Sequence, residues 1–168
     1  MTNGEEKFYG KYRGTVTDNA DPMQLGRLQV TVTDAPLCGN GSGWAMPCVP
    51  YAGKNVGLFL IPPKDALVWV EFEGGDPDKP IWAGCFWASG ETPASPAVAE
   101  TKVLKTDAGT ITLNDQKGSG SITIKMNDQN ELTIVIDTQK IKLSNGSSQT
   151  IEISKSSVKV NGDALEVQ

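Results

Sequence analysis

Few residues in this chain have the types and spacing that catalysis requires. The 168 residues contain no histidine, which removes Ser-His-Asp and Cys-His machinery, imidazole bases and histidine metal sites. Two acidic pairs, Glu71/Glu73 and Asp76/Asp78, have the spacing of paired carboxylates. The first pair alternates along an expected strand and shares its solvated face, and the second lies in a proline-rich turn. Because a general acid needs a carboxyl desolvated in a cleft, we predict no catalytic residue.

The remaining candidate nucleophiles and phosphate ligands also lack the partners that they need. Cys38, Cys48 and Cys85 show neither CxxC nor zinc spacing, so we expect reduced, packed thiols. Without histidine there is no ordinary base to activate Cys48. Ser42 does not lie in a GxSxG elbow, and the glycines between residues 39 and 43 lack the GK[ST] ending of a phosphate loop. We therefore predict that the chain is not an enzyme and holds no cofactor and no metal ion.

Charge and hydropathy exclude two further classes. Lys and Arg number 15 against 20 Asp and Glu, a net charge of -5, whereas proteins held by phosphate neutralisation present a concentrated basic surface. The longest apolar run, residues 56–63, is too short to span a membrane and ends in two prolines. The start of the chain lacks the apolar core of a secretory signal. We expect a chain assembled in the cytoplasm, which can still become part of a particle that leaves the cell.

Composition divides the chain into two regimes. Every Phe, Tyr and Trp lies between Phe8 and Trp87, and every proline lies between Pro22 and Pro96. Residues 88–101 form a run of small residues with two prolines, typical of a linker. We therefore predict a first domain at residues 1–87 with a short N-terminal arm, a linker at 88–101, and a second domain at 102–168.

The first domain has the pattern of a small closed β unit. Apolar residues recur with a period of two in short runs, which are separated by Gly, Pro and Asp residues. No helical period is present. Five strands must close on themselves or pair with another sheet to bury Trp69, Phe72, Trp82 and Phe86, and a five-stranded OB-fold barrel is the simplest solution. The expected strands are Tyr12 to Thr17, Arg27 to Thr33, Val56 to Ile61, Leu67 to Phe72 and Ile81 to Trp87.

Such barrels often bind single strands through aromatic residues in a basic groove, so the aromatics need that test. Trp44, Tyr51, Phe59 and Trp69 have no Lys or Arg interleaved with them along the expected strands. We therefore expect no nucleic-acid binding, and we expect these aromatics in the core or at contacts between barrels.

The second domain reads as a repeat of short strands. Its apolar residues stand two apart in seven runs, one face is aliphatic, and the other carries Thr, Lys, Ser and Glu. Turns such as Asn145-Gly146 recur every seven to eleven residues, a spacing that favours a β-helix or β-prism. The runs are residues 110–113, 121–126, 132–136, 140–143, 150–153, 157–160 and 164–167.

A single chain cannot bury this aliphatic face, because the sequence offers no aromatic residue and no second layer to cover it. Three identical faces around a common axis would bury it. We predict an intertwined homotrimer, closed by ladders between chains, and an all-β fold overall. The predicted trimer core comprises Ile111, Leu113, Ile122, Ile124, Leu132, Ile134, Ile136, Ile141, Leu143, Ile151, Ile153, Val158, Val160, Leu165 and Val167.

The first domain resembles a known family in the order and spacing of its turns. The residues that carry the resemblance are Asp18 followed by Gly26-Arg27-Leu28, the segment from Pro47 to Gly53, the exit Ile61-Pro62-Pro63, and the loop from Phe72 to Asp78. Over residues 10–87 they resemble the OB-fold domain of the baseplate assembly protein V, gp5 and VgrG spike family of contractile phage tails and related injection systems. The motif positions at turns are Gly26, Gly53, Pro62, Gly74, Gly75, Asp76, Pro77, Pro80 and Gly84.

The resemblance implies a structural function and a set of partners. Spike proteins of this family commonly follow the OB-fold domain with a triple-stranded β-helix. The implied protein is a central spike that joins a tail hub at its OB-fold end to a PAAR-like tip protein at its C-terminal end, and meets the target membrane only mechanically. Some members carry an iron site built from histidines at the tip. This chain has no histidine, so we predict no such metal site.

Two other functions remain open on the sequence. A trimeric receptor-binding fibre or adhesin would need an aromatic-lined distal site, and the second domain has no aromatic residue. An acidic OB-fold protein that binds single-stranded nucleic acid is the other alternative.

Overall fold

The computed structural model describes residues 7–32, 43–127, 132–162 and 164–167. Two compact units make up the chain, Met1–Gly90 and Glu91–Gln168. Within the described ranges every element is a strand, apart from one 3-10 turn at Glu73–Gly75. The described residues include no helix long and apolar enough to cross a membrane. The all-β fold class is therefore confirmed.

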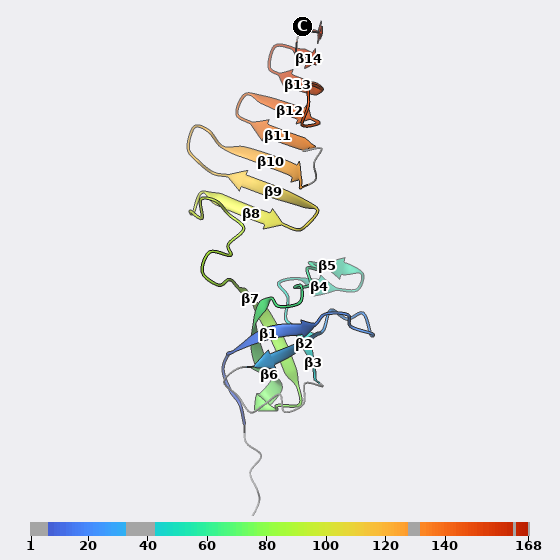
Figure 1. The fold of residues 1–168 in the computed structure, drawn as a ribbon, viewed down its shortest axis with the longest axis vertical. Helices are drawn as coiled ribbons and strands as arrows, with labels where there is room; N and C mark the ends of the chain where they lie inside the picture. The colour runs from blue at the N-terminus through green and yellow to red at the C-terminus, as the bar shows by residue number, and fades with distance from the viewer. Residues whose placement is uncertain (1–6, 33–42, 128–131, 163, 168) are drawn as a thin grey trace, which may run out of the picture. The chain divides into compact units, whose positions relative to one another are not determined.

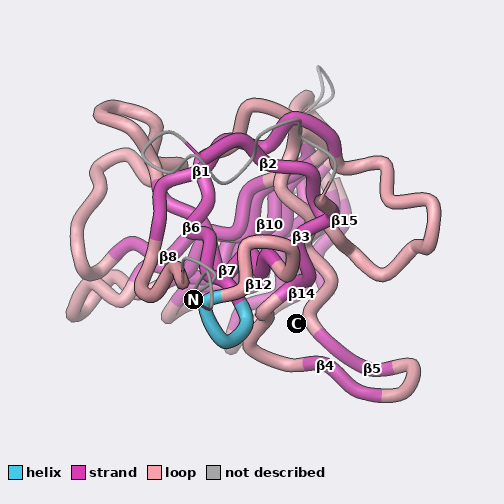
Figure 2. The backbone as a smooth tube through the Cα atoms, turned by 90° about the horizontal axis from the view of Figure 1, so that it is seen from below, coloured by secondary structure: helices cyan, strands magenta, loops and turns pink. Residues whose placement is uncertain are grey.

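The first unit is a closed five-stranded barrel, as predicted (Figures 1 and 2). Its strands close in the order β1-β2-β3-β7-β6, and all neighbours are antiparallel except β3 and β7. Closure leaves no free sheet edge among the five barrel strands. The strands are β1 (Tyr12–Asp18), β2 (Leu28–Val32), β3 (Trp44–Pro47), β6 (Leu67–Phe72) and β7 (Pro80–Phe86).

One of the five expected strands was wrong. The run from Val56 to Ile61 supplies only the two-residue strand β5 (Val56–Gly57), which pairs with β4 (Ala52–Gly53) in a hairpin outside the barrel. The barrel is completed by β3 instead, which begins at Trp44 and has a single buried side chain, Ala45. The error has a physical reason, because a four-residue strand without apolar alternation carries no periodic signal.

The barrel core is aliphatic, with two aromatic residues. Phe72 and Trp82 are buried as expected, whereas Trp69 and Phe86 stack on each other outside the core, with ring centroids 4.7 Å apart. The expectation that all four aromatics fill the core was therefore wrong, since Trp69 alternates with the buried neighbours Val68 and Val70. The core comprises Val16, Leu28, Val30, Val32, Ala45, Val68, Val70, Phe72 and Trp82.

The second unit is one antiparallel meander in which each strand pairs with the next along the chain (Figure 1). The ladder partners of every strand belong to the same chain, whereas the sequence suggested ladders between chains. One chain therefore builds a complete sheet. Its strands are β8 (Thr101–Lys105), β9 (Gly109–Asn114), β10 (Ser121–Met126), β11 (Thr133–Asp137), β12 (Lys140–Ser144), β13 (Thr150–Ser154), β14 (Val158–Val160) and β15 (Leu165–Val167).

The sequence predicted seven of these eight strands and missed β8. Its residues TKVLK place two apolar side chains side by side instead of two apart, so alternation gave no signal. Pairing with β9 defines the strand, with Leu104 opposite Ile111 and Lys102 opposite Leu113.

Short polar side chains close the turns of the meander. Asp137 Oδ1 accepts the N–H groups of Gln139 and Lys140 at 2.7 and 2.9 Å, and Asn161 Oδ1 accepts the N–H of Thr150 at 3.0 Å. Thr106, Asn114, Asn145 and Ser154 accept backbone N–H groups in the same way. These bonds fix the strand ends and therefore the register of the sheet.

Gly26 combines a positive φ with a close approach of two side chains. Its φ is +77°, and its carbonyl oxygen accepts the buried Trp82 indole N–H at 3.0 Å. A Cβ placed there would lie 2.9 Å from Ile61 Cδ1 and 3.2 Å from Phe59 Cε2. Glycine is needed here both for the backbone conformation and for the close approach.

Replacing Gly26 tests this account of the barrel, and Gly74 provides a matched control. Gly74 also has a positive φ, but an added Cβ there meets no atom within 4 Å. We expect Gly74→Ala to cost about 1 kcal/mol through backbone strain. Gly26→Ala should cost about 1 kcal/mol more, because the ends of the Ile61 and Phe59 side chains must shift to admit the methyl group. Thermal unfolding followed by tryptophan fluorescence measures both, and equal losses would contradict the close-approach argument.

Candidate functional site

The meander presents two uninterrupted rows of aliphatic side chains on one face. Cross-strand register aligns the first row through Leu104, Ile111, Ile124, Ile134, Leu143, Ile151, Val160 and Leu165. It aligns the second row through Leu113, Ile122, Ile136, Ile141, Ile153, Val158 and the position of Val167. Of the predicted core residues, the rows include all but Leu132, which lies beside Met126 at the margin of the same face. We call this surface the aliphatic face.

The aliphatic face is open in the single chain. Its side chains are between 37% exposed, at Ile111, and 57% exposed, at Leu165, and only Val160 is half-buried. The face is also hollowed between β10 and β14, where a concavity of about 580 Å³ is lined by residues that include Ile124, Leu143 and Ile151. A continuous apolar surface of this size on a protein marks a binding or assembly surface.

The opposite face of the meander is polar. Glu152 lies between Lys140 and Lys142, with N···O distances of 2.9 and 3.1 Å. These two ammonium groups lower the pKa of the Glu152 carboxyl below its usual value. The sheet therefore has one face suited to water and one suited to burial.

The strands of the meander shorten along the chain. Strands β9 and β10 have six residues each, β11 to β13 have five, and β14 and β15 have three. Figure 1 shows the sheet narrowing towards its C-terminal end.

The motif residues of the barrel lie at turns, strand ends and irregularities. Gly74 and Gly75 adopt positive φ in the turn before β7, and Pro80 begins β7. Pro77 lies in that turn, where Asp76 Oδ1 accepts the N–H of Asp78 at 3.0 Å. The remaining four are spread over the unit. Gly26 lies just before β2, and the Pro62 carbonyl accepts the Asn19 side-chain N–H at 3.0 Å. Gly53 lies in β4, and Gly84, at φ +108°, lies within β7.

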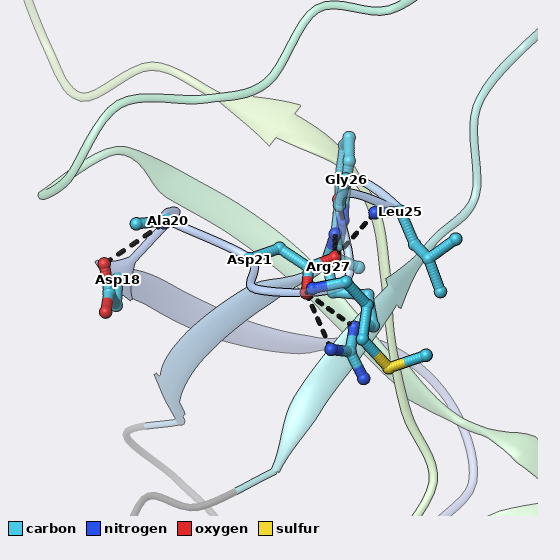
Figure 3. A network of polar contacts seen from close by, with 8 residues as sticks. Asp18, Ala20, Asp21, Leu25, Gly26 and Arg27 are labelled. Carbon is cyan, nitrogen blue, oxygen red and sulfur yellow. Dashed lines mark hydrogen bonds and ion pairs between the residues drawn. The ribbon is translucent and has the colours of Figure 1, made fainter.

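A buried carboxylate organises the loop between β1 and β2, and the sequence did not single it out. Asp21, whose side chain is 4% exposed, accepts the N–H groups of Met23, Leu25 and Arg27. It also accepts the Arg27 side chain, with Nη2 at 2.6 Å and Nε at 3.1 Å (Figure 3). The Arg27 guanidinium, aided by these backbone N–H groups, holds the pKa of Asp21 far below its ordinary value. An Asp six residues before an Arg in a turn-rich segment was the available signal.

Two arginines of the barrel lie over aromatic rings. Arg13 Cζ lies 5.6 Å from the Trp69 ring and 5.4 Å from the Phe86 ring, and Arg27 Cζ lies 5.4 Å from the Trp44 ring. Arg13 is the direct cross-strand partner of Trp69. Alternation along single strands could not reveal a contact made between strands.

The other chemical candidates lie apart from one another. Glu71 pairs with Lys11, and Asp76 pairs with Lys79 at 3.3 Å, so one member of each acidic pair is held in a surface ion pair. Among the described residues no three His, Cys, Asp or Glu side chains gather as a metal site would require.

The cysteine expectation was half right. The two cysteines in the described ranges, Cys48 and Cys85, are unpaired, but both are exposed rather than packed. Cys38, Ser42 and the glycines from 39 to 42 lie outside the described residues.

A closed OB-like barrel followed by a meander with an open aliphatic face defines an all-β structural protein built for assembly. Comparison with known families agrees. Residues 12–87 match the type VI secretion system/phage-baseplate injector OB domain, and residues 101–166 match the phage baseplate V C-terminal trimerisation domain. The two matches follow one another and together cover well over half of the chain. The chain belongs to the baseplate V, gp5 and VgrG family.

A curated relative supports the same assignment. The chain is 30% identical over 109 residues to the type VI secretion system spike protein VgrG1c of Pseudomonas aeruginosa. The match covers 58% of this chain and 15% of the relative, so the chain spans a small part of that protein's length.

The Asp21 network predicts how the barrel responds to acid. A depressed pKa means that this carboxylate stabilises the fold fully above its unfolded value of 3.8, and that the contribution is lost as the pH falls below it. Asp21→Asn should therefore lower the melting temperature at neutral pH and reduce its further drop in acid. The exposed Asp78→Asn variant should keep the acid response of the parent chain. Calorimetry between about pH 7 and about pH 3 measures both, and an unchanged acid response in Asp21→Asn would contradict the assignment.

Proposed function

We propose that this chain forms a homotrimer that serves as the central spike of a contractile phage tail or related injection system. One observation carries the proposal. The two aliphatic rows run the length of a region that matches a trimerisation domain, and they have no cover in the single chain. Three copies around a threefold axis would turn each aliphatic face inward and each polar face to water.

The proposed spike is a three-sided prism. Each chain supplies one sheet with its own complete ladder, so the contacts between chains come from side chains on the axis. The decrease in strand length from six residues to three would narrow the prism towards its C-terminal end. A body held by continuous ladders and a dry axis resists bending and opens only by breaking many contacts together.

The role of the proposed spike is mechanical. It would join a hub protein at the barrel end to a PAAR-like tip protein at the narrow end, and sheath contraction would drive it through the target envelope. Assembly in the cytoplasm followed by incorporation into the particle fits this role.

A charge on the axis tests the trimer. In Ile134→Asp, three carboxylates would meet in a dry interior, at a cost of several kcal/mol each. We expect this variant to sediment as single chains. Val135→Asp is the matched control, because Val135 lies next along β11 on the polar face, opposite Lys142. That control should remain trimeric, and a trimeric Ile134→Asp chain would show that the wrong face was assigned to the axis.

The position of the chain in a particle tests the spike role. An antibody against the meander, followed by gold labelling and electron microscopy of purified particles, should mark one end of each particle. Label along the shaft, or particles free of the chain, would contradict the proposal. Particles from a strain that lacks the chain serve as the control for background labelling.

A further inference from the structure

The hairpin of β4 and β5 stands outside the barrel as a sheet of its own. Ala52 pairs with Gly57 and Gly53 pairs with Val56, and the Leu58 N–H donates to the Tyr51 carbonyl at 2.9 Å. Figures 1 and 2 both show the hairpin projecting away from the barrel strands. Two paired residues on each side make one of the smallest possible ribbons, and a ribbon of this kind is not stable in water by itself.

The hairpin is apolar as well as exposed. Every residue from 51 to 60 is exposed, including Tyr51 at 59% and Phe59 at 70%. The only charged side chain in this stretch is Lys54. Exposed apolar residues are common on proteins, but a projecting ribbon made almost wholly of them is not.

The apolar surface continues from the hairpin onto the loop between β1 and β2. Phe59 approaches Gly26 so closely that a Cβ there would lie 3.2 Å from its ring. Just before Gly26 the loop exposes Met23, at 63%, and Leu25, at 47%. Asp21 fixes this loop through its bonds to the Met23 and Leu25 N–H groups, so the surface is preformed. We call it the hairpin patch, and define it as Met23, Leu25, Tyr51, Leu58, Phe59 and Leu60.

We infer that the hairpin patch packs against the barrel unit of a second copy of this chain. The inference rests on the proposed trimer. The barrel ends at Phe86 and the meander begins at Thr101, and a tether of this length spans roughly 20 Å when flexible. Trimerisation of the meanders would hold three barrels at an effective concentration in the millimolar range, where even a modest apolar contact forms.

The nature of the patch fits a second copy. The patch contains no charge and lies on a chain with a net charge of -5, so contact between copies through an uncharged surface avoids the repulsion that acidic surfaces would bring. The centres of protein interfaces are enriched in aromatic residues and methionine and depleted of charged residues, and the hairpin patch has this composition.

Hydrogen–deuterium exchange of the full chain tests the inference. The backbone amides of residues 51–60 should exchange about tenfold more slowly in the parent chain than in Ile134→Asp. The amides of β6, in the barrel core, should exchange alike in both. If the amides of residues 51–60 exchange equally fast in the two chains, the inference is overturned, and the hairpin patch would be a surface for another protein. Equal protection in the two chains would also overturn it, because the cover would then come from the same chain.

A second variant keeps the test decisive if Ile134→Asp does not fold. Phe59→Ser should raise the exchange of residues 51–60 by about tenfold while the sedimented mass stays that of the parent assembly. Lys54→Ser, in the turn of the same hairpin, is the control and should leave exchange unchanged. A parent chain that sediments as a monomer refutes the proposed function. A trimer whose hairpin is unprotected refutes only this inference.

Discussion

The meander of residues 101–167 forms its backbone hydrogen bonds within one chain but leaves its aliphatic side chains exposed. Each strand finds its hydrogen-bond partners in the same chain, so the sheet can form without help. Its two aliphatic rows have nothing to pack against there, and they remain between about one-third and three-fifths exposed. Removing this surface from water is the main free energy available to the second unit, at about 25 cal/mol per Å². That free energy is released only when copies of the chain meet.

The barrel buries its apolar side chains within one chain, unlike the meander. It closes on itself, and the core that includes Val16, Leu28 and Trp82 is buried within one chain. Its specific features are local, such as the Gly26 carbonyl that accepts the Trp82 indole and the Asp21 carboxylate that organises the adjoining loop. The barrel has its own core, so its loops can vary freely. The meander forms its core only with other copies of the chain, so its aliphatic face must be uninterrupted. This difference accounts for the aromatic residues of one half and the uniform aliphatic residues of the other.

Periodicity predicted most of the fold and little of the local chemistry. Alternation located the two aliphatic rows, because a period of two is strict wherever one face must be buried. Alternation missed β3 and β8, whose few residues do not alternate. It also predicted a barrel strand in the exposed run after Val56, where there is none. The Asp21–Arg27 pair and the stacking of Arg13 on Trp69 depend on loop geometry and on cross-strand register. Neither can be read along a single stretch of sequence, and only the folded chain reveals them.

The central claim is that the aliphatic face is the interior of a threefold assembly. Sedimentation equilibrium of the unaltered chain over a wide dilution range tests it most directly. The account predicts one species of three times the chain mass of 17.9 kDa, unchanged on dilution. A folded species with the mass of a single chain, or an assembly with an even number of chains, would contradict it.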